Sequence, residues 1–171
     1  MPLDSLGLMG LLTAVDKELE RKIILVAAGG TAMTLLDLKP STIDIDFTGP
    51  YEDIKEFNRI QNSLPHGFKV DLWTDGAVFS QMLPEDYLVK SMPVKTKLVN
   101  IRLRVLHPLD IVVTKLGRLN DRDLQDIDSC IERFRLKKSQ IEKRARAVRY
   151  AGNQKVYELN LRQVLKRFFQ H

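Results

Sequence analysis

The chain has 171 residues, of which 44% are hydrophobic, enough for one folded domain or for one core with a helical extension. No run of about 18 apolar residues is present, and the apolar stretch at residues 6–15 lacks the basic leader and cleavage site of a secretory signal, so an amphipathic helix is expected there. The single cysteine, Cys130, excludes an intramolecular disulfide bond and suits a reducing environment, which predicts a cytoplasmic protein.

The net charge of +5 conceals an uneven distribution along the chain. Residues 1–130 carry 15 Lys and Arg against 19 Asp and Glu, a balance of −4, whereas residues 131–171 carry 12 against 3, a balance of +9. Clustered Lys and Arg favour a polyanionic partner such as RNA, because they displace counterions from a phosphate backbone. A solvated helix surface is the alternative explanation.

The first part of the chain predicts alternating helices and strands. A helix is expected from Asp4 or Ser5 to about Arg21, where apolar residues recur every three or four positions. The apolar run 22–28 predicts a strand buried on both faces, and Gly29-Gly30 ends it. A short helix at 31–38 and a strand around 43–47 follow.

Further along, Gly49-Pro50 marks a turn before a helix at 51–64, and a strand is expected at 68–73. Residues 74–86 are polar and rich in turn formers, and two or three short strands are expected between 87 and 105. From Pro108 onward the pattern is helical, with breaks near Asn120, Lys137 and Gly152. The four expected helices span residues 108–118, 121–136, 139–150 and 155–169.

Two carboxylates, Asp44 and Asp46, lie two residues apart in a predicted strand. Side chains alternate between the two faces of a strand, so both carboxylates point the same way. Like charges this close repel unless a cation lies between them. A hard divalent ion, most plausibly Mg²⁺, meets that need with oxygen ligands and commonly binds substrate phosphates as well. The pair therefore indicates phosphoryl or nucleotidyl transfer.

A third carboxylate and a glycine turn complete a candidate site. Asp71 lies in the next predicted strand, and if that strand neighbours the first, three carboxylates can converge on one or two metal ions. Gly29 and Gly30 allow close approach of the backbone to a phosphate at the start of a helix, and Thr31 could donate its hydroxyl. Each feature alone is common: a tight turn, a solvated strand edge or an exposed aspartate explains it equally well.

The order Gly29-Gly30, Asp44-Ile45-Asp46 and then Asp71 resembles the signature of the polymerase-β-like nucleotidyltransferase superfamily. The resemblance implies a mixed sheet flanked by helices, one or two Mg²⁺ ions held by Asp44, Asp46 and Asp71, and a nucleoside triphosphate on the glycine turn.

A narrower resemblance, to the AbiEii-type toxin nucleotidyltransferases and their uncharacterised relatives, lies in Leu106-His107-Pro108-Leu109-Asp110 and in Lys115 five residues after Asp110. It implies that Lys115 contacts the triphosphate and that Asp123 or Asp126 supplies a later acidic residue. Without the resemblance, Lys115 could extend to solvent, Asp110 could cap a helix, and the later aspartates could solvate a helix face. These toxins commonly have Gly-Ser where this chain has Gly29-Gly30.

These observations predict an α/β fold, with a nucleotidyltransferase-like small mixed β-sheet flanked by helices and a helical C-terminal part. Residues 1–130 would form the catalytic core and residues 131–171 a basic helical extension packed on it. The predicted function is Mg²⁺-dependent transfer of an NMP from an NTP to an acceptor hydroxyl, with RNA such as tRNA as the acceptor. The alternatives are a catalytically silent nucleotide- or RNA-binding partner in a toxin–antitoxin-type pair, with an antitoxin protein as its partner, and a small-molecule nucleotidyltransferase.

Overall fold

A five-stranded mixed sheet organises residues 23–105 in the computed structural model, which describes residues 2–170. The strand order is β5–β4–β2–β9–β8. Strand β2 runs antiparallel to β4 and parallel to β9, β4 runs parallel to β5, and β8 closes the other edge antiparallel to β9. The bounds are β2 Ile23–Ala27, β4 Asp44–Thr48, β5 Lys69–Leu72, β8 Met92–Pro93 and β9 Ile101–Val105.

The central position of β2 follows from its sequence. All of its residues are buried except the half-buried Ile24, as expected of a continuous apolar strand covered on both faces. Helix α1 (Ser5–Glu18) packs against α3 (Tyr51–Ser63), and α3 packs on β2. Helix α2 (Gly29–Leu35) packs on β4. The helices and strands predicted up to residue 73 are confirmed.

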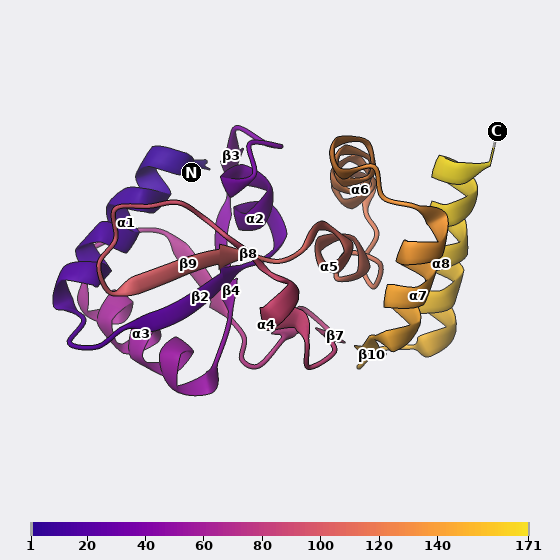
Figure 1. Cartoon of the computed structure of the whole chain (residues 1–171). Coiled ribbons are helices and arrows are strands. Elements are labelled where there is room, and N and C mark those ends of the chain that lie inside the picture. The colour runs from indigo at the N-terminus through magenta and orange to yellow at the C-terminus, as the bar shows by residue number, and fades with distance from the viewer. Residues whose placement is uncertain (1, 171) are drawn as a thin grey trace.

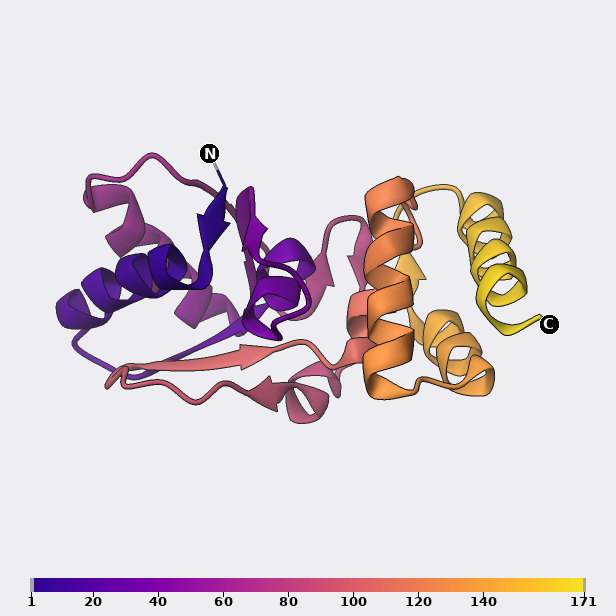
Figure 2. The same cartoon turned by 90° about the horizontal axis from the view of Figure 1, so that it is seen from above.

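Four helices form the C-terminal part of the fold: α5 (Pro108–Val113), α6 (Asp121–Phe134), α7 (Lys138–Ala147) and α8 (Gln154–Phe169). Helix α6 starts at a capping box, in which Asn120 and Asp123 bond to each other's backbone N–H. Helix α5 contacts α6 and α7, and α7 contacts α8. Figures 1 and 2 show these helices together at one end of the molecule, with α7 and α8 outermost.

The packing of these helices crosses the boundary at residue 130 that the sequence predicts between the core and the C-terminal extension. Helix α6, assigned from the sequence to the core, packs with α5, and α5 packs with α7 of the C-terminal extension. The interface between residues before and after 130 is therefore continuous with the hydrophobic core, which includes Ile127, Ile141 and Tyr157.

The segment 74–105 differs from expectation. Residues 87–90 form a single helical turn, α4 (Tyr87–Lys90), rather than a strand, while β8 and β9 account for two of the strands expected there. The polar stretch before it contains a hairpin of β6 (Ala77–Val78) and β7 (Gln81–Met82), and β10 (Arg149–Tyr150) pairs with β7. The remaining short pair is β1 (Leu3–Asp4) with β3 (Ser41–Thr42). Within residues 2–170, no helix is long and apolar enough to cross a membrane.

Candidate active site

Strand β4 delivers Asp44 and Asp46 to one cleft of about 460 Å³. Both side chains line it, as the two-residue spacing predicts for neighbours on one strand face. The opposite wall comes from α6 and from the chain that follows α5. The charged residues lining the cleft are Lys39, Asp44, Asp46, Lys115, Arg118, Arg122, Asp123 and Asp126.

The third predicted carboxylate, Asp71, lies beside this pair. Strands β4 and β5 are parallel neighbours with Asp46 directly opposite Asp71, so the two side chains share a sheet face. Asp46 is only 5% exposed. Its burial, together with the charges of Asp71 and Asp44, raises the pKa of Asp46 to about 7, although the charges of Lys115 and Arg118 oppose this. The structure thus brings the three carboxylates within electrostatic reach of one another.

These donors fit a hard divalent cation, because a positive ion among them would offset the burial and repulsion that raise the pKa of Asp46. Among residues 2–170, however, no three or more His, Cys, Asp or Glu side chains are already gathered closely enough to hold an ion. Asp71 is partly exposed and lies 3.7 Å from the Lys69 ammonium. Asp44, Asp46 and Asp71 are therefore neighbours but not a ready-made ion site in this conformation.

Gly29 and Gly30 allow the start of α2 to approach β4 closely. A Cβ on Gly29 would lie 2.6 Å from Asp46 Oδ2, and one on Gly30 would lie 2.6 Å from Thr42 Oγ1. Gly29 also has a φ of +51°, a conformation that costs little only for glycine. The residue before the helix, Ala28, provides no side-chain cap for the first N–H groups of α2. Glycine at these positions places a helix N-terminus against the buried carboxylate.

The side chain of Thr31 ties α2 to the strand. Its hydroxyl accepts a hydrogen bond from the Asp46 N–H at 2.8 Å and donates one to the Asp44 carbonyl at 3.1 Å. Thr42 donates to the same Asp44 carbonyl. These bonds fix the backbone on either side of Ile45, so the Thr31 hydroxyl positions both aspartates.

Lys115 and two aspartates of α6 meet in the wall facing β4. The ammonium of Lys115, 3% exposed, lies 2.9 Å from Asp126 Oδ2 and 3.6 Å from Asp123 Oδ1. Burial alone would raise the pKa of Asp123, but hydrogen bonds from Arg118 and the charge of Lys115 hold it below its ordinary value. The predicted residues Lys115, Asp123 and Asp126 therefore belong to one ionic network that faces the carboxylate pair.

Asp110 is not part of the cleft. It is fully buried, and both of its carboxylate oxygens accept hydrogen bonds from the guanidinium of Arg144 on α7. Arg144 also pairs with Asp86 at 2.9 Å. The pair joins α5 to α7, which is a structural role.

The sequence analysis missed three cations of the cleft. Lys39 reaches Asp126 from 87 positions away in the chain, and no local pattern indicates such a contact. Arg118 and Arg122 could have been found, because they lie only three and seven residues after Lys115, close to the predicted residues Asp123 and Asp126. With them, the cleft holds four cationic side chains beside its carboxylates.

A family model described as a nucleotidyltransferase of unknown function, DUF6036, matches residues 7–166. No curated protein and no solved structure matches the chain. The matched residues include every charged residue that lines the cleft and helices α5 to α7. On this evidence the chain belongs to the DUF6036 family of nucleotidyltransferases of unknown function.

Proposed function

We propose that the protein is a divalent-cation-dependent nucleotidyltransferase that moves an NMP from an NTP to an acceptor hydroxyl, with Mg²⁺ as the cation. Membership of a nucleotidyltransferase family implies a nucleotide substrate. The observation that carries the finer proposal is the buried Asp46 carboxyl, flanked by Asp44 and Asp71 and faced by Lys115 and Arg118. This pairing of carboxylates with cations matches what a metal–polyphosphate substrate requires.

In the proposed reaction, the acceptor oxygen attacks the α-phosphorus, the bond from that phosphorus to the β-phosphate bridging oxygen breaks, and pyrophosphate leaves. The acceptor proton passes to Asp71, directly or through a water molecule, since the Asp71 side chain is partly exposed whereas Asp46 is buried. One or two Mg²⁺ ions held by Asp44, Asp46 and Asp71 would supply charge neutralisation at the phosphates.

Two kinds of group at the cleft could bind the phosphates of a nucleotide. Gly29, Gly30 and Thr31 start a helix that lacks a side-chain cap; Gly30 lines the cleft, and Gly29 packs closely against Asp46. Lys115 lies in the facing wall, where Asp126 and Asp123 orient its ammonium. Lys39 and Arg118 share those carboxylates, so a polyphosphate entering the cleft would find cations already in place.

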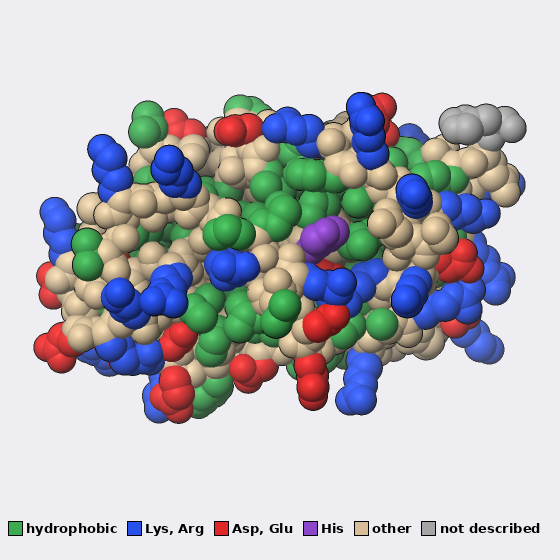
Figure 3. All heavy atoms as spheres, viewed as in Figure 1, with side chains coloured by type: hydrophobic (Ala, Val, Ile, Leu, Met, Phe, Trp, Pro, Cys, Tyr) green, Lys and Arg blue, Asp and Glu red, His purple; other side chains and the backbone are tan. Residues whose placement is uncertain are grey.

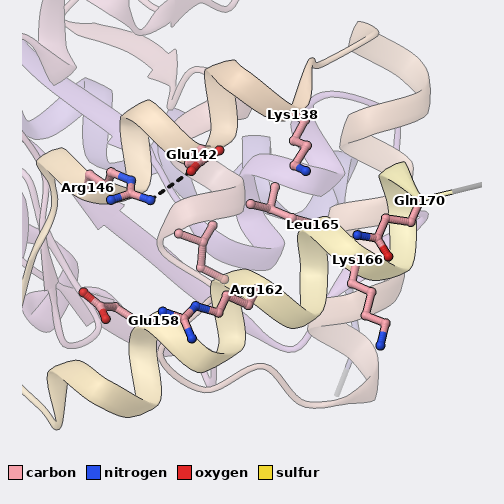
Figure 4. Close-up of a pocket in the computed structure, with 9 residues that line it drawn as sticks. Lys138, Glu142, Arg146, Glu158, Arg162, Leu165, Lys166 and Gln170 are labelled. Carbon is pink, nitrogen blue, oxygen red and sulfur yellow. Dashed lines mark hydrogen bonds and ion pairs between the residues drawn. The ribbon is translucent and has the colours of Figure 1, made fainter.

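An RNA acceptor is favoured by the surface of the outer helices. Lys and Arg side chains gather at the end of the molecule formed by α7 and α8 (Figure 3). A groove of about 410 Å³ runs between these helices, with Leu161 and Leu165 in its wall. Figure 4 shows its charged residues, which are Lys138, Glu142, Arg146, Glu158, Arg162 and Lys166. We name this surface the α7/α8 groove and assign it to the RNA backbone.

Two alternatives predict different behaviour. A silent binding partner in a toxin–antitoxin-type pair would bind nucleotide without turnover, and the mutual repulsion among the Asp46, Asp44 and Asp71 carboxylates would then serve no purpose. A small-molecule transferase would act on a non-nucleic-acid acceptor, and reversal of charges in the α7/α8 groove would leave its activity unchanged. A toxin acting on tRNA is a special case of the RNA proposal.

The test is label transfer from each of the four α-³²P-labelled NTPs to total RNA with Mg²⁺, comparing the wild type with Asp44→Asn and Asp46→Asn. We expect transfer by the wild type and a loss of at least about 100-fold in either variant, because each removes a charged ligand from the metal site. Asp75→Asn, an exposed aspartate that does not line the cleft, is the matched control and should keep wild-type activity.

Three results would count against the proposal. Absence of transfer from a folded wild type that binds NTP would favour the silent partner. Equal transfer by the wild type and both aspartate variants would exclude the assigned metal site. Transfer to small acceptors but never to RNA would support nucleotidyl transfer and exclude RNA as the acceptor.

A further inference from the structure

A second pocket, of about 300 Å³, adjoins the cleft. Phe79, Lys115 and Arg118 line both, so these three side chains form the partition between them. We call it the side pocket. Its other residues are Ser80, Gln81, Thr114, Gly117 and Tyr150.

Two aromatic rings line the side pocket. Phe79 is 36% exposed, its ring centroid lies 4.9 Å from that of Trp73, and the Arg118 guanidinium lies 5.3 Å from the Phe79 centroid. Tyr150 stacks on the buried Tyr157 at 5.0 Å. A Cβ on Gly117 would lie 2.6 Å from the Tyr150 ring, so the absence of a side chain there lets the ring pack closely. Both rings are held in position by their neighbours.

The backbone at Phe79 is strained. Phe79 and Ser80 form the two-residue turn between β6 and β7, and Phe79 has a φ of +53°. Two-residue hairpin turns favour glycine, asparagine or aspartate at positive φ, and a bulky side chain there lowers stability. A large, partly exposed aromatic in this conformation suggests that its ring serves a function other than folding.

The position of that ring links the side pocket to the candidate reaction centre. Phe79 Cζ would lie 3.3 Å from a Cβ on Gly29, and Asp46 Oδ2 would lie 2.6 Å from the same point. The ring therefore abuts the turn assigned to the phosphates and lies close to the buried carboxylate. A nucleotide with its phosphates at this turn has its base within reach of the Phe79 ring.

The polar side chains of the side pocket are largely engaged. The Gln81 amide donates to the Val78 carbonyl at 3.0 Å and accepts from the Gly117 N–H at 3.0 Å. The Thr114 hydroxyl donates to the Asp110 carbonyl at 2.7 Å.

We propose that the side pocket holds the nucleobase of the bound nucleoside triphosphate, with Phe79 as its stacking surface. This inference rests on the proposed function, because it assumes that the triphosphate lies in the cleft. Lys115 and Arg118, in the partition, then contact the phosphate end while the base lies on the side-pocket face of Phe79. Stacking on the base would give the strained Phe79 side chain a function, and neither the fold nor the carboxylates provide one.

The test compares the binding of two probes, ATP and inorganic tripolyphosphate, by calorimetry in the presence of Mg²⁺. The wild type should bind ATP more tightly than tripolyphosphate, since only ATP carries a base. Phe79→Ala should weaken ATP binding by about 5- to 100-fold and change tripolyphosphate binding less than twofold. Phe79→Tyr keeps a ring and should retain ATP affinity. Tyr51→Ala removes a similarly exposed aromatic that lines neither pocket and is the matched control.

Folding is monitored by thermal unfolding, and Phe79→Gly, which removes the backbone strain, provides a second variant should Phe79→Ala unfold. Unchanged ATP affinity in either folded variant would overturn the inference. Equal losses for ATP and tripolyphosphate would also overturn it, because Phe79 would then act through the glycine turn. A wild type that binds neither probe would overturn the proposed function as well, which distinguishes the two failures.

Discussion

The carboxyl group of Asp46 makes the cleft sensitive to pH. Burial and the neighbouring charges of Asp71 and Asp44 raise its pKa from 3.8 to about 7, so the folded state holds a proton that the unfolded chain releases near pH 4. The contribution of the Asp46 carboxyl to the free energy of unfolding is fully present below about pH 4 and is lost as the pH rises through about 7. Between pH 5 and 8, the wild type should lose about 2 to 3 kcal/mol of unfolding free energy relative to Asp46→Asn.

The measurement is urea denaturation of both proteins without added metal ions, at half-unit pH steps. Only the difference between the two curves is used, because titrating groups that do not interact with Asp46 contribute equally to both. A difference that stays constant over this range would show that Asp46 is ionised throughout. With saturating Mg²⁺ the slope should shrink, since the cation stabilises the ionised form.

Gly29 provides a second test at the residue scale. Gly29→Ala places a Cβ 2.6 Å from Asp46 Oδ2 and forces alanine into a φ of +51°. We expect a cost of about 1 to 2 kcal/mol from the backbone alone, and at least tenfold weaker Mg²⁺–ATP binding because the carboxylate must move. Gly10→Ala is the matched control: apart from the adjoining backbone of helix α1, no atom lies within 4 Å of the new Cβ.

Gly10→Ala should stabilise the protein by about 0.5 to 1 kcal/mol and leave ligand binding unchanged. Calorimetric titration and thermal unfolding report both quantities for each variant. Wild-type ligand binding by a folded Gly29→Ala protein would mean that the close approach of the turn to Asp46 has no role in the site.

Among the elements, α5 and α7 are joined by a buried ion pair. Asp110 is fully buried and receives two hydrogen bonds from Arg144, so removing Arg144 leaves the Asp110 carboxylate uncompensated, and removing Asp110 leaves Arg144 with only the half-exposed Asp86. Asp110→Asn and Arg144→Met should each cost about 3 to 5 kcal/mol, whereas Asp110→Leu combined with Arg144→Met should recover part of that loss. Arg146→Ala, which breaks an exposed pair with Glu142, should cost less than about 0.5 kcal/mol.

These values are measured by chemical denaturation, with a double-mutant cycle for the buried pair. Additive losses at Asp110 and Arg144 would mean that the two groups do not act together. The pair also explains why Arg144, although it lies in the basic segment 131–171, does not belong to the surface available to RNA.

How far the sequence predicts each element depends on whether its signal is local. Periodic helices such as α3 and α8 and the apolar strand β2 were predicted within a few residues, because their patterns lie within one stretch of chain. Helix α4 was not predicted, because Leu88 and Val89 favour a strand whereas the chain forms a helical turn before β8. The hairpin of β6 and β7 was missed because its turn uses Phe79 where glycine is the usual signal.

At the scale of the whole molecule, the carboxylate pair and its neighbour Asp71 were predictable, whereas the facing wall was only partly so. The pairing of β4 with β5 that sets Asp46 opposite Asp71 is confirmed. Lys39 and Asp126 meet across 87 residues through tertiary packing alone, which local sequence patterns do not encode. The role of Asp110 was open for the same reason, because its partner Arg144 is 34 residues away.

The C-terminal helices belong to the packed fold, which changes how their role should be tested. Ile141, Ala145 and Tyr157 are buried in the core, so a chain ending at residue 130 exposes the surface of α5 on which α7 and Tyr157 pack, and it also shortens α6. We expect this truncated chain to lose cooperative thermal unfolding, as judged by circular dichroism. A cooperative transition at the wild-type temperature would instead identify residues 131–171 as a separable extension.

Charge reversal tests the RNA proposal without disturbing the core. In the groove variant, glutamate replaces four exposed residues of the α7/α8 groove, which are Lys138, Arg146, Arg162 and Lys166. The matched control reverses four exposed lysines on the other part of the molecule, at Lys22, Lys55, Lys95 and Lys97. Both variants change the net charge equally, so only the location of the charge differs.

Binding of a labelled tRNA is measured from 50 to 200 mM salt. The wild type should show a negative slope of log affinity against log salt, and the groove variant should lower the magnitude of that slope by roughly 2 to 3, since each lost phosphate contact on a single strand contributes about 0.7. The control should keep most of the wild-type slope. Equal changes in both variants would mean that net charge alone attracts RNA, and the α7/α8 groove would then not be the acceptor site.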